Sequence, residues 1–307
     1  MPDPLSLLLL GDSRDRQLFG QTIGRTCTGV PAGCQGMSNR HGRDAPFCYS
    51  FQWAMPATFP IESRWQSKGG SLCTRNASRL AAYGYMITYG VSPTPPYLHD
   101  FATHYHTGWS GGEEADAIGW RDDESNEPSN AKVNAVALAV EASTRFQQRA
   151  TAFSRVAVVY SSFLWDAGRR AEHAPRQPVE QWAAEFERNY SAAVEHLSKA
   201  LAMNDAANPA RPPSVLALAT PYDVLPAWKF YDASSNATER MVDFAANLVR
   251  RTARLGKLPL VDYRRAFRGS RRPLPELIDI WGHPTGAGVA IAWSTLQTAL
   301  GVGIELE

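Results

Sequence analysis

A serine that directly follows an apolar run is the first residue of this sequence with the potential for chemistry. The run 5–10 holds five leucines and one serine, and Gly11-Asp12-Ser13 follows it. A short apolar segment that ends at a glycine is typical of a strand buried on both faces. Open α/β sheets bind their ligands at the carboxyl ends of such strands. If the chain is an enzyme, Ser13 is therefore the first candidate for its nucleophile, the alternative being a serine that caps a helix.

Apolar segments that alternate with segments of helical periodicity define the expected fold. The expected strands cover 5–10, 85–89, 155–161, 214–219 and 258–262, and the expected helices cover 13–24, 130–146, 178–204, 238–255 and 285–300. Such alternation predicts a parallel sheet with helices on both faces. We expect one α/β domain over 1–307, a three-layer α/β/α sandwich with a five-stranded parallel sheet in the flavodoxin-like order 2-1-3-4-5.

Two irregular stretches, at about 26–83 and 97–130, interrupt this pattern, and we interpret them as insertions. The first contains all four cysteines of the chain, Cys27, Cys34, Cys48 and Cys73. An even number of clustered cysteines predicts two disulfides that tie down this loop, the alternative being reduced thiols. Their spacings do not match a zinc site.

Three N-glycosylation sequons, at Asn76, Asn189 and Asn236, agree with the disulfide prediction. Disulfides and glycans both form in the secretory pathway. We expect a glycoprotein of the Golgi lumen or the extracellular space, from which a leader or an anchor has been removed.

The overall composition excludes several classes of function. The chain has 44% apolar residues, 20% charged residues and a net charge of +1, which is ordinary for a globular protein. This charge gives no sign of a nucleic-acid partner, and no apolar window is long enough to span a membrane. Loop histidines without a fixed spacing rarely bind a metal, so we expect neither a metal nor a cofactor at His99, Asp100, His104 and His106.

Motifs along almost the whole chain resemble those of one enzyme family. Gly11-Asp12-Ser13 follows the first strand, and Asp279 and His283-Pro284 precede the last helix, in the order found in the SGNH/GDSL hydrolase superfamily. The longer pattern Gly-Asp-Ser-x-Asp-Arg and Leu164-Trp165-Asp166 are similar to its PC-esterase and trichome-birefringence-like branch. That branch contains esterases and polysaccharide O-acetyltransferases of the secretory pathway.

The resemblance implies a Ser–His–Asp triad. A serine hydroxyl needs an adjacent general base, and His283 is the candidate because its pKa lies near the working pH. A carboxylate must hold the imidazole in the right tautomer. The family has this Asp three residues before the His, where this chain has Ile280. We therefore expect Asp279, four residues before, with Asp262 as the alternative.

The expected oxyanion hole departs from the family pattern. Its first donor is the backbone amide of Ser13, at the start of a helix, and Gly90 is the candidate second donor. The Asn that many members carry after the third strand is missing here, so Ser162 or the Trp165 indole is the candidate replacement. We expect Asp15 and Arg16 to form a local charged pair. The candidate substrate-binding residues are Asp12, Arg16 and Trp281.

Together these observations predict a serine esterase or O-acyltransferase that forms an acyl-Ser13 intermediate. The resemblance implies small-molecule or polysaccharide ester substrates, in particular acetyl esters of carbohydrate. The displaced Asp and the missing Asn favour an alternative, a non-catalytic carbohydrate- or protein-binding module on the same scaffold. A lipid esterase is disfavoured because the sequence shows no amphipathic lid.

Overall fold

The computed structural model describes the central sheet and most of the chain after residue 154. The described residues are 5–12, 14–15, 18–19, 22, 53–54, 80–87, 90–91, 136, 139–140, 143–144, 146–147, 154–228, 231–232, 236–279 and 282–302. Several residues named above lie outside them: Ser13, Arg16, Ile280, Trp281, Asn76, Asp100, His99, His104, His106 and the cysteines Cys27, Cys34, Cys48 and Cys73.

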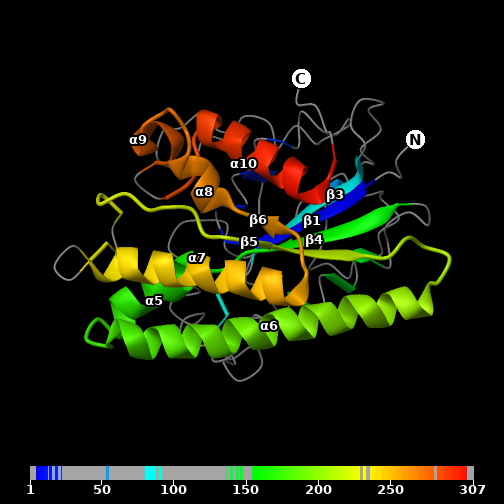
Figure 1. The fold of residues 1–307 in the computed structure, drawn as a ribbon, viewed down its shortest axis with the longest axis horizontal. Helices are drawn as coiled ribbons and strands as arrows, with labels where there is room; N and C mark the ends of the chain where they lie inside the picture. The colour runs from blue at the N-terminus through cyan, green and yellow to red at the C-terminus, as the bar shows by residue number, and fades with distance from the viewer. Residues whose placement is uncertain are drawn as a thin grey trace, which may run out of the picture.

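A six-stranded sheet in the order β2-β3-β1-β4-β5-β6 forms the centre of the molecule (Figure 1). Its strands are β1 (Leu5–Gly11), β2 (Trp53–Ala54), β3 (Leu80–Ile87), β4 (Arg155–Tyr160), β5 (Val215–Ala219) and β6 (Leu260–Val261). The five strands from β3 to β6 pair in parallel, which confirms the predicted order 2-1-3-4-5. The short strand β2 pairs antiparallel with β3 and was not predicted.

β1 is a central strand, and every one of its residues is buried. Leu8 and Leu10 enter the hydrophobic core on one face of the sheet, whereas Leu5, Leu7 and Leu9 enter the core on the other. A strand with apolar neighbours on both faces needs no polar alternation, which explains the leucine run.

Helices cover both faces of the sheet, as predicted (Figure 1). On one face lie α5 (Leu164–His173), α6 (Val179–Ala207) and α7 (Ala237–Gly256), and on the other lie α8 (Tyr263–Arg268), α9 (Leu274–Leu277) and α10 (Gly286–Leu300). Along α6 the rings of Trp182, Phe186 and Tyr190 stack in sequence, at centroid distances of 5.0 and 5.7 Å. This i, i+4 series is the apolar stripe that predicted the helix. Within the described part of the chain no helix is long and apolar enough to span a membrane.

The structure corrects three local predictions. β3 begins at Leu80, inside the stretch 26–83 that we interpreted as irregular. The segment 80–84 has no β-branched residue, so its strand conformation depends on parallel pairing with β1 rather than on local propensity. Helix α5 was not predicted. Helix α7 ends at Gly256, one residue beyond the predicted end at 255, and Lys257 takes the left-handed cap position, with φ of 52°.

Candidate active site

The described candidate residues lie on one edge of the sheet, where the parallel strands end. Asp12 follows β1, and Gly90 follows β3. The backbone N–H of Leu164 donates to the Asp12 carboxylate across 3.4 Å. A Cβ atom at Gly282 would lie 3.8 Å from the Leu164 Cδ1. Leu164 therefore joins the end of β1, which leads to Ser13, to the turn that carries His283.

The structure brings Asp279 to His283. The Asp279 Oδ2 lies 3.6 Å from the His283 Nδ1, and the backbone N–H of His283 donates to the Asp279 Oδ1 across 3.1 Å. The backbone N–H of Asp279 in turn donates to the His283 carbonyl, across 2.8 Å. Gly282 has φ of 80°, a conformation that favours glycine, and this closes the turn. A four-residue spacing thus still places the carboxylate beside the imidazole.

The Asp279 carboxylate faces the Nδ1 atom of the His283 imidazole. In a serine hydrolase the carboxylate contacts Nδ1, and Nε2 takes the proton from the nucleophile. The side chains of His283 and Asp279 are 23% and 16% exposed, so both are partly screened from water. The separation of 3.6 Å is that of an ion pair and exceeds hydrogen-bond length.

Asp262, the alternative partner for His283, is engaged elsewhere. Arg250 donates to both of its carboxylate oxygens, with N–O distances of 2.8 and 2.9 Å. Asp262 also caps α8 by accepting from the Arg265 backbone N–H. Burial opposes its ionisation, but these hydrogen bonds hold the pKa of Asp262 below its ordinary value. The geometry therefore favours Asp279 as the orienting carboxylate.

Asp166 holds the loop after β3 in place. Its carboxylate accepts from the Val91 backbone N–H, at 3.1 and 3.2 Å, and from the Ser162 hydroxyl, at 3.0 Å. Gly90 has φ of 96°, and a Cβ there would lie 2.6 Å from the Asp166 Oδ1. The position therefore requires glycine. Because Ser162 donates its proton to Asp166, Gly90 and the partly buried Trp165 are the better candidates for the oxyanion hole.

A buried ion pair flanks the position of Ser13 in the sequence. Asp12 and Arg14 form this pair, and each side chain is 1% exposed. The Arg14 guanidinium also lies over the Tyr222 ring, 5.3 Å from its centroid. Burial opposes ionisation of Asp12, but the charge and hydrogen bonds of Arg14 hold its pKa below the ordinary value. Asp12 is thus too buried to bind substrate, contrary to our expectation, and we assign it to the support of this turn.

Asp15 is buried beneath the turn that follows β1. It is 2% exposed and accepts a hydrogen bond from the Ser161 hydroxyl, whereas Arg16, its predicted partner, lies outside the described residues. A Cβ at Gly11 would lie 2.0 Å from its Oδ2, so Gly11 makes room for this carboxyl. Burial and the charge of Asp12 raise the pKa of Asp15 to about 7. The sequence signal was its place on the buried side of the first helix.

The described residues around this edge show no cluster suited to a metal. Among the residues that the structure describes, no group of three or more His, Cys, Asp or Glu side chains lies together. The loop histidines considered above fall outside that part of the chain.

No protein-family model and no curated protein matches the chain. Several solved structures are similar to it. A GDSL-like lipase from Parabacteroides merdae is 12% identical, covers 98% of this chain and 97% of its own, and gives a TM-score of 0.44. A catalytic mutant of Axe2, an acetylxylan esterase from Geobacillus stearothermophilus, is 12% identical, with coverage of 99% and 97% and a TM-score of 0.42. Est24, a carbohydrate acetylesterase from Sinorhizobium meliloti, is 11% identical, with coverage of 96% and 97% and a TM-score of 0.42.

Proposed function

We propose that the chain is a serine esterase or O-acyltransferase of the SGNH/GDSL type, acting on acetyl esters of carbohydrate. The observation that carries the proposal is the contact of Asp279 with the His283 Nδ1. This contact lies at the edge of the sheet where β1 ends with Gly11, which Asp12 follows. The carbohydrate substrate rests on the motif resemblance, in particular on the pattern Gly-Asp-Ser-x-Asp-Arg.

The proposed reaction has two steps. In the first, the Ser13 Oγ attacks the ester carbonyl while His283 takes its proton, and Asp279 stabilises the imidazolium. The tetrahedral oxyanion accepts hydrogen bonds from the backbone amides of Ser13 and Gly90, and the leaving alcohol receives the proton from His283. In the second step water or an acceptor hydroxyl, deprotonated by His283, attacks the acyl-Ser13 carbonyl; the bond to the Ser13 Oγ breaks, and His283 returns the proton to this oxygen as the product leaves. Exclusion of water decides between hydrolysis and transfer.

Turnover of p-nitrophenyl acetate, with and without a sugar acceptor, tests the proposal. We expect Ser13→Ala and His283→Ala each to lower kcat by roughly a thousand-fold or more. Matched controls are Ser294→Ala and His196→Ala, because both side chains are exposed on helices, on α10 and α6. Full activity of the Ser13→Ala protein would overturn the proposal. Acetylated sugar in the presence of the acceptor identifies a transferase.

A non-catalytic binding module is the second candidate function. The observation that favours it is the 3.6 Å separation of Asp279 and His283, which is too long for a hydrogen bond. A protein of this kind would bind acetylated oligosaccharide with the same affinity in its native and Ser13→Ala forms, and would not turn over p-nitrophenyl acetate.

We also propose a secretory-pathway glycoprotein with two disulfides in the stretch 26–83. Of the two described sequons, Asn236 is exposed at the start of α7, whereas Asn189 is partly buried in the middle of α6. A glycan needs an exposed attachment site, so Asn236 is the better acceptor. Peptide mapping of protein secreted from eukaryotic cells, without reduction, should find the glycan on Asn236 and no free thiol. Four free thiols would contradict the proposal.

A further inference from the structure

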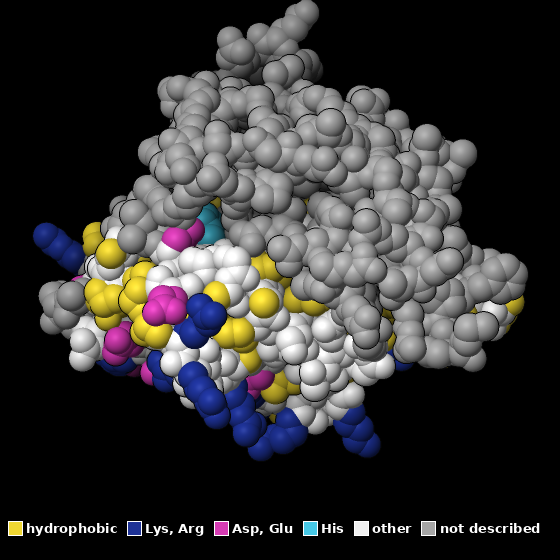
Figure 2. Space-filling model, turned by 90° about the horizontal axis from the view of Figure 1, so that it is seen from above, with side chains coloured by type: hydrophobic (Ala, Val, Ile, Leu, Met, Phe, Trp, Pro, Cys, Tyr) yellow, Lys and Arg dark blue, Asp and Glu magenta, His cyan; other side chains and the backbone are white. Residues whose placement is uncertain are grey.

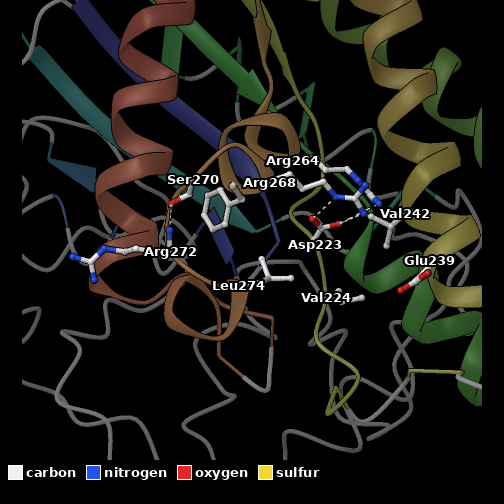
Figure 3. Close-up of a pocket in the computed structure, with 10 residues that line it drawn as sticks. Asp223, Val224, Glu239, Val242, Arg264, Arg268, Ser270, Arg272 and Leu274 are labelled. Atoms are coloured by element: carbon white, nitrogen blue, oxygen red, sulfur yellow. Dashed lines mark hydrogen bonds and ion pairs between the residues drawn. The ribbon is translucent and has the colours of Figure 1, made fainter.

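A polar pocket of about 270 Å³ lies between α7, α8 and the segment that follows β5 (Figure 3). Pockets for drug-sized ligands enclose roughly 300–1,000 Å³, so this one suits a ligand near the size of a single sugar ring. The proposed reaction does not use this pocket. Its lining includes three arginines, the buried carboxylate of Asp223, the exposed carboxylate of Glu239 and several apolar side chains.

The pocket adjoins the candidate active site through one side chain. Val224 lines the pocket, and its Cγ1 would lie 4.0 Å from a Cβ at Gly282. Gly282 directly precedes His283. The Val224 side chain therefore separates a ligand in the pocket from the turn that carries His283. This distance is short enough for one unit of a polymeric substrate to occupy the pocket while the neighbouring unit lies at His283.

Two guanidinium groups in the pocket share one acceptor. Arg268 donates to Asp223 from Nε and Nη2, with distances of 2.8 and 3.1 Å, and the Arg264 Nη2 lies 3.2 Å from the same carboxylate (Figure 3). Asp223 is 8% exposed, so this carboxylate is fixed. The Nη1 of Arg268 donates no hydrogen bond within the described part of the chain, and its side chain is 56% exposed. Arg268 thus keeps donors for a ligand.

The wall of the pocket belongs to an arginine-rich segment. The ten residues Tyr263–Arg272 contain five arginines and no acidic residue. Over 236–279 there are ten Arg and Lys against five Asp and Glu, although the net charge of the whole chain is only +1. Lys and Arg side chains gather along one side of the described surface (Figure 2). Such a local excess of positive charge attracts anions over distances of about 8–10 Å at physiological salt.

The rest of the lining is suited to a sugar ring. Phe267 and Leu274 provide apolar surface, and Ser270 provides a hydroxyl group. A pyranose has an apolar ring face and polar hydroxyl groups at its edge, so it needs both kinds of contact. Arg272 also lines the pocket, but Figure 3 shows its guanidinium pointing away from Asp223.

We infer that this pocket binds a carboxylate-bearing sugar unit of an acidic polysaccharide. The carboxylate accepts hydrogen bonds from Arg268, and the ring packs on Phe267 and Leu274. A guanidinium that is held by Asp223 is already oriented, so little side-chain entropy is lost on binding. The inference rests on the proposed function, because it identifies the class of polysaccharide whose ester reaches Ser13.

Calorimetric titration of the whole chain carrying Ser13→Ala tests the inference without turnover. The probes are tetragalacturonate, which is acidic, and xylotetraose, which is neutral. We expect the acidic oligosaccharide to bind at least about tenfold more tightly at low salt, and this difference to shrink as salt screens the charges. Adding Arg268→Gln should lower the affinity for tetragalacturonate by about tenfold or more.

The matched control is Arg251→Gln, which removes the same charge from an exposed arginine paired with Glu187 on α6. It should leave the affinity within about twofold. Equal affinities for the two oligosaccharides, or equal losses in the two variants, would overturn the inference. Displacement of tetragalacturonate by an equal concentration of inorganic phosphate would show that a phosphate, not a sugar acid, is the ligand, and would also overturn it.

Failure of the inference is distinguishable from failure of the proposed function. The function is read from p-nitrophenyl acetate turnover by the unmodified protein, which does not involve the pocket. Turnover with equal binding of both oligosaccharides overturns the inference alone. Arg268-dependent binding of tetragalacturonate without turnover supports the pocket as a sugar-acid site and overturns the esterase.

Discussion

Among single residues, the carboxylate that faces His283 matters most for the proposed reaction. Asp279 and Asp262 were both candidates from the sequence, and the structure separates them. Asp279 shares a closed turn with His283, whereas Asp262 is bound by Arg250 and caps α8. A carboxylate with both oxygens on a guanidinium cannot also orient an imidazole elsewhere. Substitution of each residue should therefore affect different properties.

We expect Asp279→Asn to lower kcat by about a hundred-fold or more with little change in KM, because the amide no longer stabilises the imidazolium. Asp262→Asn is the matched control. It should leave kcat within about threefold but lower the free energy of unfolding by about 1–2 kcal/mol through the weakened cap and ion pair. Steady-state kinetics and urea denaturation measure the two effects. A larger loss of kcat in Asp262→Asn would reverse the assignment.

The buried Asp15 predicts a dependence of stability on pH. Its pKa is about 7 in the folded protein and about 3.9 in an unfolded chain. Between these values the folded state holds a proton that the unfolded state has lost, so stability falls as pH rises from about 4 to about 7 and then levels off. Asp15→Asn keeps a neutral group beside Ser161, so this variant should lose the decline.

Urea denaturation at pH 5 and pH 7.5 measures this effect. The unmodified protein should be less stable at pH 7.5, and Asp15→Asn should be the more stable of the two proteins at that pH, by an amount on the order of a few kcal/mol. An equal pH dependence in both proteins would show that Asp15 carries no raised pKa.

At the scale of elements, the site is formed by connections that the strands hold at one edge. β1 and β4 are adjacent and parallel, so Asp12, Asp15 and Ser161 meet where the two strands end. The next connection, after β3, is tied to α5 by Asp166.

Substitution of Gly90 tests how the connection after β3 is held in place. In Gly90→Ala the Cβ would lie 2.6 Å from the Asp166 carboxyl, in a backbone conformation that side chains rarely adopt. We expect a loss of about 1–3 kcal/mol in the free energy of unfolding and a fall in kcat, since the loop must move. Gly286→Ala is the control: nothing lies within 4 Å of its Cβ, so stability should change by less than about 0.5 kcal/mol. Equal effects of the two substitutions would contradict this account of Gly90.

Local patterns in the sequence predicted much of the fold but less of the site. The apolar runs of β1, β4 and β5 and the stripe of α6 carry their own signals, and the structure confirms them. The start of β3 was misplaced and the burial of Asp15 was not predicted, because tertiary contacts decide both. The alanines of β3 have little strand propensity without β1, and the burial of Asp15 depends on Gly11 and Ser161. The spacing of Asp279 and His283 in the sequence also does not predict the left-handed conformation of Gly282, which brings these two residues together.

At the scale of the whole molecule, both ends of the chain contribute to one edge of one sheet. β1 leads to Ser13 near the N-terminus, and the turn of His283 directly precedes α10, the last helix (Figure 1). The pocket formed by Asp223 and Arg268 lies next to this turn, on the side of α7. Such an arrangement gives an extended substrate one reacting position and one recognition position. We propose that Ser13 is the nucleophile at the reacting position.

The most direct test of that claim is mass spectrometry of the whole chain after reaction with a fluorophosphonate, which labels only an activated serine. We expect one adduct per molecule, located on Ser13 by peptide mapping, and its loss in His283→Ala. An unlabelled native protein, or a label on another serine, would contradict the assignment of Ser13 as the nucleophile.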